Sequence, residues 1–141
     1  MNKNNLMLRS IALGLLLLLA ACGQAQPAAL SLEQVEQTAA SLLTAIDQDD
    51  YEAFQRDFSP EMVTAFDAQQ FSQLRDLLQA QSGRYVSMQT PALSNSGEYA
   101  VYRIRCQYEL EDVMVTLTFK INGTQVEGLF FDSPNLRSAS Q

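Results

Sequence analysis

The spacing of apolar side chains changes once along this chain, at Gly83. Before Gly83 they recur every three or four residues, which is the repeat of an amphipathic helix. After Gly83 they alternate with polar residues, which is the repeat of a half-buried strand. Helices that precede a set of strands are the only elements available to cover the apolar face of the resulting sheet. The sequence therefore predicts an α+β domain over residues 31–133, with N-terminal helices packed on a four-stranded antiparallel sheet.

Capping residues divide the helical half into four predicted helices. Ser31 and Gln34 match a capping box, Ser59 precedes a Pro at the first helical position, and Asp67 begins the last helix. The side chains that we expect to face the sheet share one apolar stripe on each helix. They are Leu32, Val35, Ala39, Leu42, Leu43, Ile46, Tyr51, Phe54, Phe58, Met62, Val63, Phe66, Phe71, Leu74, Leu77 and Leu78.

The strand half is predicted to form strands over residues 85–90, 99–110, 113–121 and 124–131, with Ser94–Gly97 as a loop. Two-residue turns at Glu111–Asp112 and at Asn122–Gly123 would set the register. The resulting cross-strand pairs are Leu110 with Val113, Tyr108 with Val115, Cys106 with Leu117, Ile104 with Phe119, Tyr102 with Ile121, Phe119 with Val126, Leu117 with Gly128 and Val115 with Phe130. These pairs place the apolar residues of three strands on one face, which a one-residue slip would abolish.

Two sets of residues in this sheet are candidate functional sites. Large side chains on the inner face would line a pocket beneath the helices, or fill that space as core: Tyr102, Ile104, Tyr108, Phe119 and Phe130. On the outer face, Met114, Leu129 and Phe131 are predicted to form an apolar patch. This patch could contact a protein partner or a second copy in a homodimer. Coverage by residues 134–141, a predicted C-terminal tail, or simple exposure are the alternatives.

The composition argues against several functional classes. The sequence contains no His, which removes the commonest general base and zinc ligand. Residues 23–141 keep seven basic and sixteen acidic side chains, a formal charge of −9, so we expect no nucleic-acid partner. Cys106 faces inward and is expected to be buried rather than reactive. No catalytic residue, metal site or cofactor is predicted, and the acidic cluster at Asp47–Glu52 is interpreted as helix capping.

The first 21 residues have the pattern of an export signal. A polar start with Lys3 and Arg9 precedes an apolar run over residues 11–21, which is too short for an ordinary membrane-spanning helix. The end of this run, Leu19-Ala20-Ala21-Cys22, resembles the bacterial lipobox. The resemblance implies cleavage of residues 1–21 and acylation of Cys22, with residues 22–30 as a flexible tether. An ordinary signal peptide and an uncleaved anchor are the alternatives.

The lipobox resemblance implies an extracytoplasmic protein held at the cell membrane by its acyl chains, such as palmitate. Gly23 follows the Cys where an Asp would suggest retention at the inner membrane. The outer membrane is therefore an alternative address if the cell has two membranes.

The helical segment Leu43–Phe54, followed by Asp57–Met62, resembles the opening of the nuclear transport factor 2-like (cystatin-like cone) fold, and Val126–Phe131 resembles its last strand. The likeness is to small bacterial secreted or lipoprotein domains of unassigned function. It implies a curved sheet, with a pocket between sheet and helices. The resemblance leaves three functions open: non-enzymatic binding of a small apolar ligand or protein partner, an isomerase or dehydratase, and a structural envelope lipoprotein.

Overall fold

A computed structural model describes residues 28–140, in which four helices precede the strands as predicted and a further helix follows them. The helices are α1 (Leu32–Asp47), α2 (Tyr51–Gln55), α3 (Pro60–Ala65), α4 (Ala68–Gln81) and α5 (Pro134–Ala139). The strands are β1 (Tyr85–Met88), β2 (Ala92–Ser96), β3 (Tyr99–Tyr108), β4 (Asp112–Lys120) and β5 (Val126–Asp132). The α+β class is confirmed.

The predicted helix starts are confirmed by their cap geometry. The Ser31 hydroxyl accepts a hydrogen bond from the Gln34 backbone amide at 3.2 Å. The Gln34 side-chain oxygen accepts one from the Ser31 backbone amide at 3.1 Å. Asp67 starts α4 in the same way. Ser59 caps α3 and Asp50 caps α2, each through its side chain. One carboxylate of the acidic cluster therefore serves as a helix cap.

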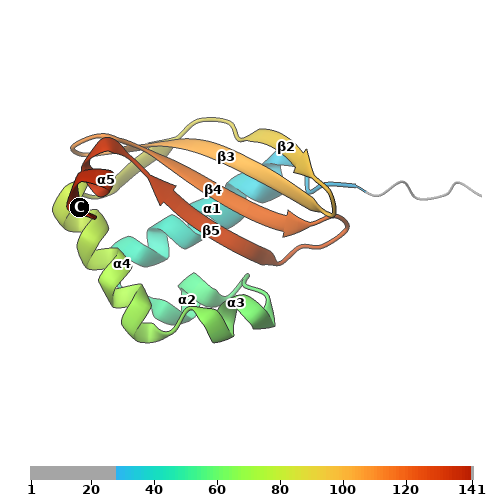
Figure 1. Cartoon of the computed structure of the whole chain (residues 1–141), viewed down its shortest axis with the longest axis horizontal. Helices are drawn as coiled ribbons and strands as arrows, with labels where there is room; N and C mark the ends of the chain where they lie inside the picture. The colour runs from blue at the N-terminus through green and yellow to red at the C-terminus, as the bar shows by residue number, and fades with distance from the viewer. Residues whose placement is uncertain (1–27, 141) are drawn as a thin grey trace, which may run out of the picture.

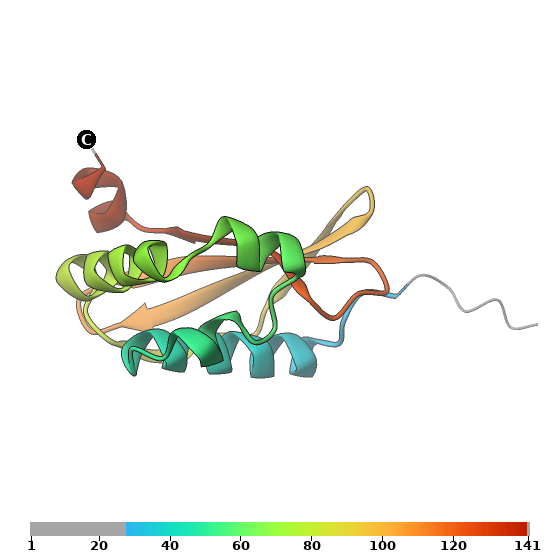
Figure 2. The ribbon, with the colours of Figure 1, turned by 90° about the horizontal axis from the view of Figure 1, so that it is seen from below.

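Helix α1 crosses one face of the sheet, whereas α3 and α4 lie on the side of β5 (Figures 1 and 2). Every inward position predicted on β3 from Ala100 to Tyr108 is buried, and so are Val113, Val115, Leu117 and Phe119 on β4. They pack against the buried stripe of α1 and against Phe54, Phe58, Phe71 and Leu78. All members of this core, including the partly buried ones, lie between Ala29 and Leu136. Within the described residues, this core joins the helices to the sheet.

The sheet has five strands rather than the four predicted. The hydrogen-bonded order is β1-β3-β4-β5. Strand β2 pairs with the first half of β3, whereas β1 pairs with its last residues. The prediction of a loop at Ser94–Gly97 was wrong because β2 is mostly polar and exposed, so it carries no alternating apolar signal. Gly97, with a φ of +61°, forms the turn into β3.

The turn between β3 and β4 lies at Glu109–Leu110, two residues before the predicted turn. The Tyr108 amide donates to the Glu111 carbonyl at 2.9 Å, which closes this turn. Its position is fixed by tertiary packing, since a Cβ on Gly83 would lie 2.8 Å from the Glu109 Cβ. Local turn propensity could not reveal this contact.

The displaced turn changes the partners across β3 and β4 but keeps the faces. Ile104 pairs with Val115, and Ala100 pairs with Phe119. The shift moves every pair by an even number of positions, so inward residues remain inward. The predicted pairs across this hairpin were wrong, although the buried face was right. Leu110 is the exception, because it lies in the turn and is 66% exposed.

The predicted C-terminal tail folds back as α5. Ser133 caps this helix by accepting a hydrogen bond from the Leu136 amide at 3.2 Å. Leu136 is 7% exposed and belongs to the apolar core. The tail therefore does not cover the outer face of the sheet. No helix within residues 28–140 combines the length and apolar character that crossing a bilayer requires.

Candidate binding groove

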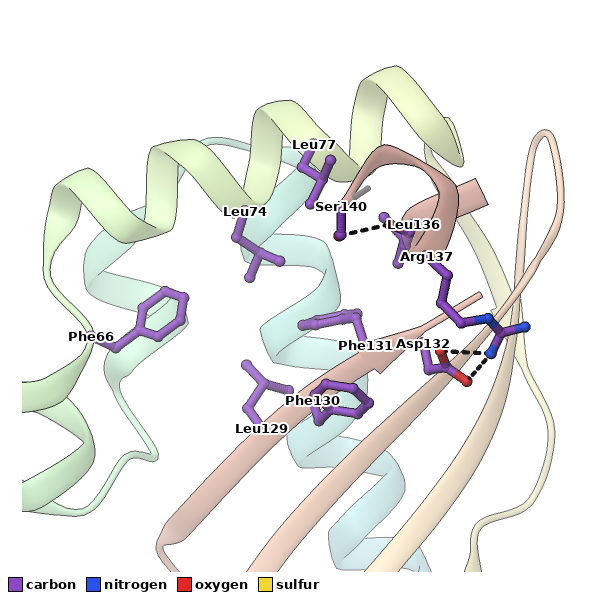
Figure 3. Close-up of a pocket in the computed structure, with 10 residues that line it drawn as sticks. All are labelled: Phe66, Leu74, Leu77, Leu129, Phe130, Phe131, Asp132, Leu136, Arg137 and Ser140. Atoms are coloured by element: carbon purple, nitrogen blue, oxygen red, sulfur yellow. Dashed lines mark hydrogen bonds and ion pairs between the residues drawn. The ribbon is translucent and has the colours of Figure 1, made fainter. Parts of the chain in front are cut away.

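An apolar groove of about 520 Å³ lies between β5, α4 and α5 (Figure 3). Its walls are mainly large apolar side chains from the end of α3, from α4, from β5 and from α5. They are Phe66, Leu74, Leu77, Leu129, Phe130, Phe131 and Leu136, with Asp132, Arg137 and Ser140 at one end. We call this feature the β5–α4 groove. Its volume is within the range of ligand pockets, about 300–1,000 Å³.

A β-bulge in β5 brings two of these side chains into the groove. Phe119 pairs with Val126 as predicted, but Thr118 pairs with Gly128, so Glu127 is an extra residue. The predicted pairing of Val115 with Phe130 was wrong, because every residue beyond the bulge moves by one position. A shift of one position exchanges the two faces of the strand.

Leu129 and Phe131 therefore point to the inner face, opposite Leu117 and Val115. Phe130 lies on the outer face opposite Thr116, is 63% exposed, and borders the groove only at its margin. Its predicted place among the inward side chains was wrong. The predicted outer patch is divided as well, since Met114 keeps the outer face whereas Leu129 and Phe131 leave it.

Helix α4 presents two apolar sides rather than one. Phe71 and Leu78 are buried against the core. Leu74 and Leu77 instead point towards β5 across the groove, and Leu77 is 37% exposed (Figure 3). Sequence reasoning missed this division and placed all four residues in the core. The adjacent pair Leu77–Leu78 was the available signal, because it widens the stripe beyond a single contact face.

Helix α5 closes one end of the groove and is held there by Glu111. The Glu111 carboxylate accepts hydrogen bonds from the Ser82 hydroxyl at 2.7 Å, the Ser133 hydroxyl at 2.6 Å and the Asn135 amide at 3.2 Å. Desolvation acts to raise the pKa of Glu111, but the hydrogen bonds from Ser133, Ser82 and Asn135 outweigh it and hold that pKa below its usual value. One carboxylate thus joins the end of α4, the β3–β4 turn and the start of α5.

The charged end of the groove is self-paired. Arg137 donates to both carboxylate oxygens of Asp132, at 2.8 Å and 2.7 Å. The Arg137 side chain is 59% exposed and the Asp132 side chain 36%, so solvent screens the pair and it contributes little to stability. These are the only ionisable side chains that line the groove. Among the described residues, no group of three or more acidic or Cys side chains is arranged to hold a metal ion.

The predicted pocket-lining residues of β3 and β4 are core residues. Tyr102, Ile104 and Phe119 are fully buried, and Tyr108 is nearly so, and none of them lines the groove. The Tyr102 hydroxyl donates to the Leu30 carbonyl. Burial raises the pKa of Tyr102 and of Tyr108 above the usual value for a phenol. The interface between α1 and the sheet is therefore filled by side chains.

Of the two cysteines of the chain, the structure describes only Cys106. Cys106 is fully buried, and desolvation raises the pKa of its thiol to about 12. Such a group is a small apolar core residue rather than a nucleophile. Cys22, the predicted lipidation site, lies outside the described residues.

Asp47 lies close enough to the buried Tyr108 to affect its titration, a long-range contact that sequence pattern could not indicate. Its carboxylate accepts a hydrogen bond from the Tyr85 amide at 3.2 Å. Desolvation raises the pKa of Asp47, and its charge in turn raises the pKa of Tyr108. Asp47 does not line the groove, and its contact with Tyr85 ties the end of α1 to the start of β1.

A comparison with protein families matches residues 39–129 to a family described as a protein of unknown function, DUF3887. The matched span covers more than half of the chain. The chain belongs to the DUF3887 family. Searches of curated proteins and of solved structures gave no match. The matched span of the DUF3887 domain runs from the middle of α1 to Leu129 of β5, so it contains Leu74 and Leu77, whereas Phe131 and Leu136 lie beyond it.

Proposed function

We propose that this DUF3887 protein is a membrane-tethered, extracytoplasmic binding domain that takes an apolar ligand in the β5–α4 groove. The observation that carries the proposal is the groove itself, where four elements turn large apolar side chains towards a common open space. Exposed apolar surface of this kind is costly in water and marks binding sites. The interface between α1 and the sheet is filled, so a ligand would bind in the groove rather than beneath α1.

Binding rather than catalysis is favoured by the groove lining. A general acid or base must reach the substrate and hold a suitable proton. The ionisable groups that line the groove, Asp132 and Arg137, are paired with each other at one end. Neither Asp47 nor Tyr108, the acid and phenol that an isomerase would need, lines the groove, because Tyr108 is buried in the core and Asp47 lies partly exposed at the end of α1. The proposal therefore assigns the groove no reaction.

The tether is proposed to be the acyl group on Cys22. Five residues, 23–27, separate Cys22 from Ala28, so the six steps from Cα to Cα span at most about 21 Å. Ala28 is fixed to the β4–β5 turn, since its amide donates to the Asn122 side chain at 2.8 Å. This turn lies at the opposite end of the sheet from α5 (Figure 1). A protein tethered in this way would direct the groove away from the bilayer.

The fold is proposed to be a nuclear transport factor 2-like cone. Its support is the order of elements, with helices first and an antiparallel sheet wrapped over α1. A homodimer through the outer face of the sheet stays a prediction, and its apolar side chains there would be Met114 and Phe130 rather than the predicted three.

The binding proposal is tested with Nile red, a neutral apolar dye whose fluorescence rises in an apolar site. A segment of residues 28–141 contains every core residue of the described part of the chain, and a cooperative urea unfolding transition establishes that it folds before the titration. We expect saturable binding at one site, and Leu77→Asp should weaken it at least tenfold because it puts a charge into the groove wall.

Leu93→Asp is the matched control. Leu93 lies on β2, is 46% exposed and does not line the groove, so the same substitution there should leave dye affinity unchanged. Equal affinities of the two variants, or no saturable binding by the parent, would show that the groove is not a ligand site.

The tether is tested by cell fractionation. Wild-type protein should partition with the membrane fraction, and Cys22→Ser should release it, because only the acyl chains hold it there. Continued membrane association of Cys22→Ser would refute the lipid anchor without affecting the groove.

A further inference from the structure

The backbone of β5 indicates which class of ligand the groove binds, an inference that rests on the proposed function. Strand β5 is the last strand of the sheet order, so one edge of it lacks a neighbouring strand. Unpaired backbone N–H and C=O groups on an edge are a template for another strand. The groove therefore has one wall that offers backbone hydrogen bonds and another, α4, that offers apolar side chains.

The chain itself shows that an extended segment fits on this edge. The Val126 amide donates to the Asp57 carbonyl at 2.7 Å, and the Ser59 amide donates to the Val126 carbonyl at 3.0 Å. Phe58 thereby forms an isolated parallel bridge with Val126. At Pro60 the chain turns into α3 and leaves the edge.

Beyond this bridge the edge is open from Gly128 to Asp132. No other described residue makes a backbone hydrogen bond to it outside the pairing with β4. Five strand residues span about 16 Å, enough for a pentapeptide. We propose that the β5–α4 groove binds an extended peptide segment of a partner protein, which adds as a strand to β5 and places alternate apolar side chains among Leu74, Leu77 and Phe131.

Two other occupants fit the geometry less well. An acyl chain would fill the groove but leave the edge amides and carbonyls of β5 without partners, which is costly once water is excluded. A second copy pairing through β5 would bring a whole sheet to this edge. Helices α3 and α4 stand on the same side as β5, in the path by which a second sheet would approach this edge (Figures 1 and 2).

The partner segment should be neutral or basic at its ends. Residues 28–140 carry seven basic and sixteen acidic side chains, a formal charge of −9. An acidic peptide would be repelled by this field. The probe is therefore acetyl-Lys-Val-Thr-Val-Thr-Val-Lys-amide, whose alternation gives one apolar side and whose Lys residues limit self-association.

The test is a titration of ¹⁵N-labelled residues 28–141 with this peptide and with two versions that are N-methylated at alternate residues. Each version lacks the N–H donors of one edge of the strand. We expect shifts and slowed hydrogen exchange at the amides of Gly128–Asp132, and at least a tenfold loss of affinity for one of the two methylated peptides. Leu77→Asp should weaken binding, whereas Leu93→Asp should not.

Four results would overturn the peptide inference. If both methylated peptides bind as tightly as the parent, the backbone of β5 is not the recognition element. If Nile red binds and the peptide does not, the groove is a site for another apolar ligand and the proposed function survives. If the edge amides are protected in a dimer without peptide, the edge belongs to a second copy. Failure of both dye and peptide would remove the proposed function as well.

Discussion

The inner face of the sheet has two regions with similar side chains, of which one is packed as core and the other borders an open groove. Between α1 and the strands β3 and β4, apolar residues meet at close range and the interface is filled. Between α4 and β5, apolar residues also face each other but leave the groove of about 520 Å³. The difference is geometric, because α1 crosses the sheet whereas α4 lies beside its last strand (Figures 1 and 2). Apolar pattern alone therefore does not distinguish core from binding surface.

The largest contrast is expected from truncating one side chain in each region. Phe119 is fully buried between sheet and helix, so Phe119→Ala should lower the free energy of unfolding by about 3–5 kcal/mol. Leu77 borders the groove, and Leu77→Ala should cost less than about 1 kcal/mol. Urea unfolding of both variants measures the difference. Similar losses would mean that the groove is packed core after all.

A smaller effect is expected where the two regions are joined. Glu111→Gln weakens the charge-assisted hydrogen bonds to Ser82, Ser133 and Asn135, and should cost about 1–2 kcal/mol at pH 7. Because the pKa of Glu111 is lowered in the folded state, its contribution is present above the unfolded pKa of about 4.3 and is lost as the pH falls through the folded value.

Unfolding of wild type and Glu111→Gln at a series of pH values measures this contribution. The stability gap between the two proteins should be constant from pH 7 to about pH 5 and should close at lower pH. A gap that does not depend on pH would show that the carboxylate charge is not the source of the stabilisation.

The smallest effect is expected at the rim of the groove. Arg137→Ala breaks the exposed pair with Asp132 and should change the free energy of unfolding by less than about 0.5 kcal/mol. The same urea experiment checks it. A loss above about 1 kcal/mol would place the pair among the groups that hold α5.

The sequence predicted the closed region well because local rules decide it. The caps at Ser31, Ser59 and Asp67 and the alternation along β3 each follow from local chemistry. The buried face was predicted correctly although the turn was not, because a shift by an even number of positions leaves every side chain on its face.

The open region could not be predicted because long-range contacts decide it. The bulge at Glu127 exchanges the faces of Phe130 and Phe131, and its one local signal was Gly128, an isolated glycine inside the strand pattern, which does not by itself fix the register. Strand β2 was missed because its polar side chains do not alternate with apolar ones. Leu74 and Leu77 were assigned to the core because periodicity gives the face of a helix but not the distance to its neighbour.

The bulge is the feature on which the groove depends, and cross-strand nuclear Overhauser contacts test it directly. Backbone contacts across β4 and β5 should join Leu117 with Leu129 and Val115 with Phe131, with Phe119 still opposite Val126. Contacts of Leu117 with Gly128 and of Val115 with Phe130 would instead show regular pairing. In that case Phe130 would face inward, Leu129 and Phe131 would face outward, and the account of the groove would be wrong.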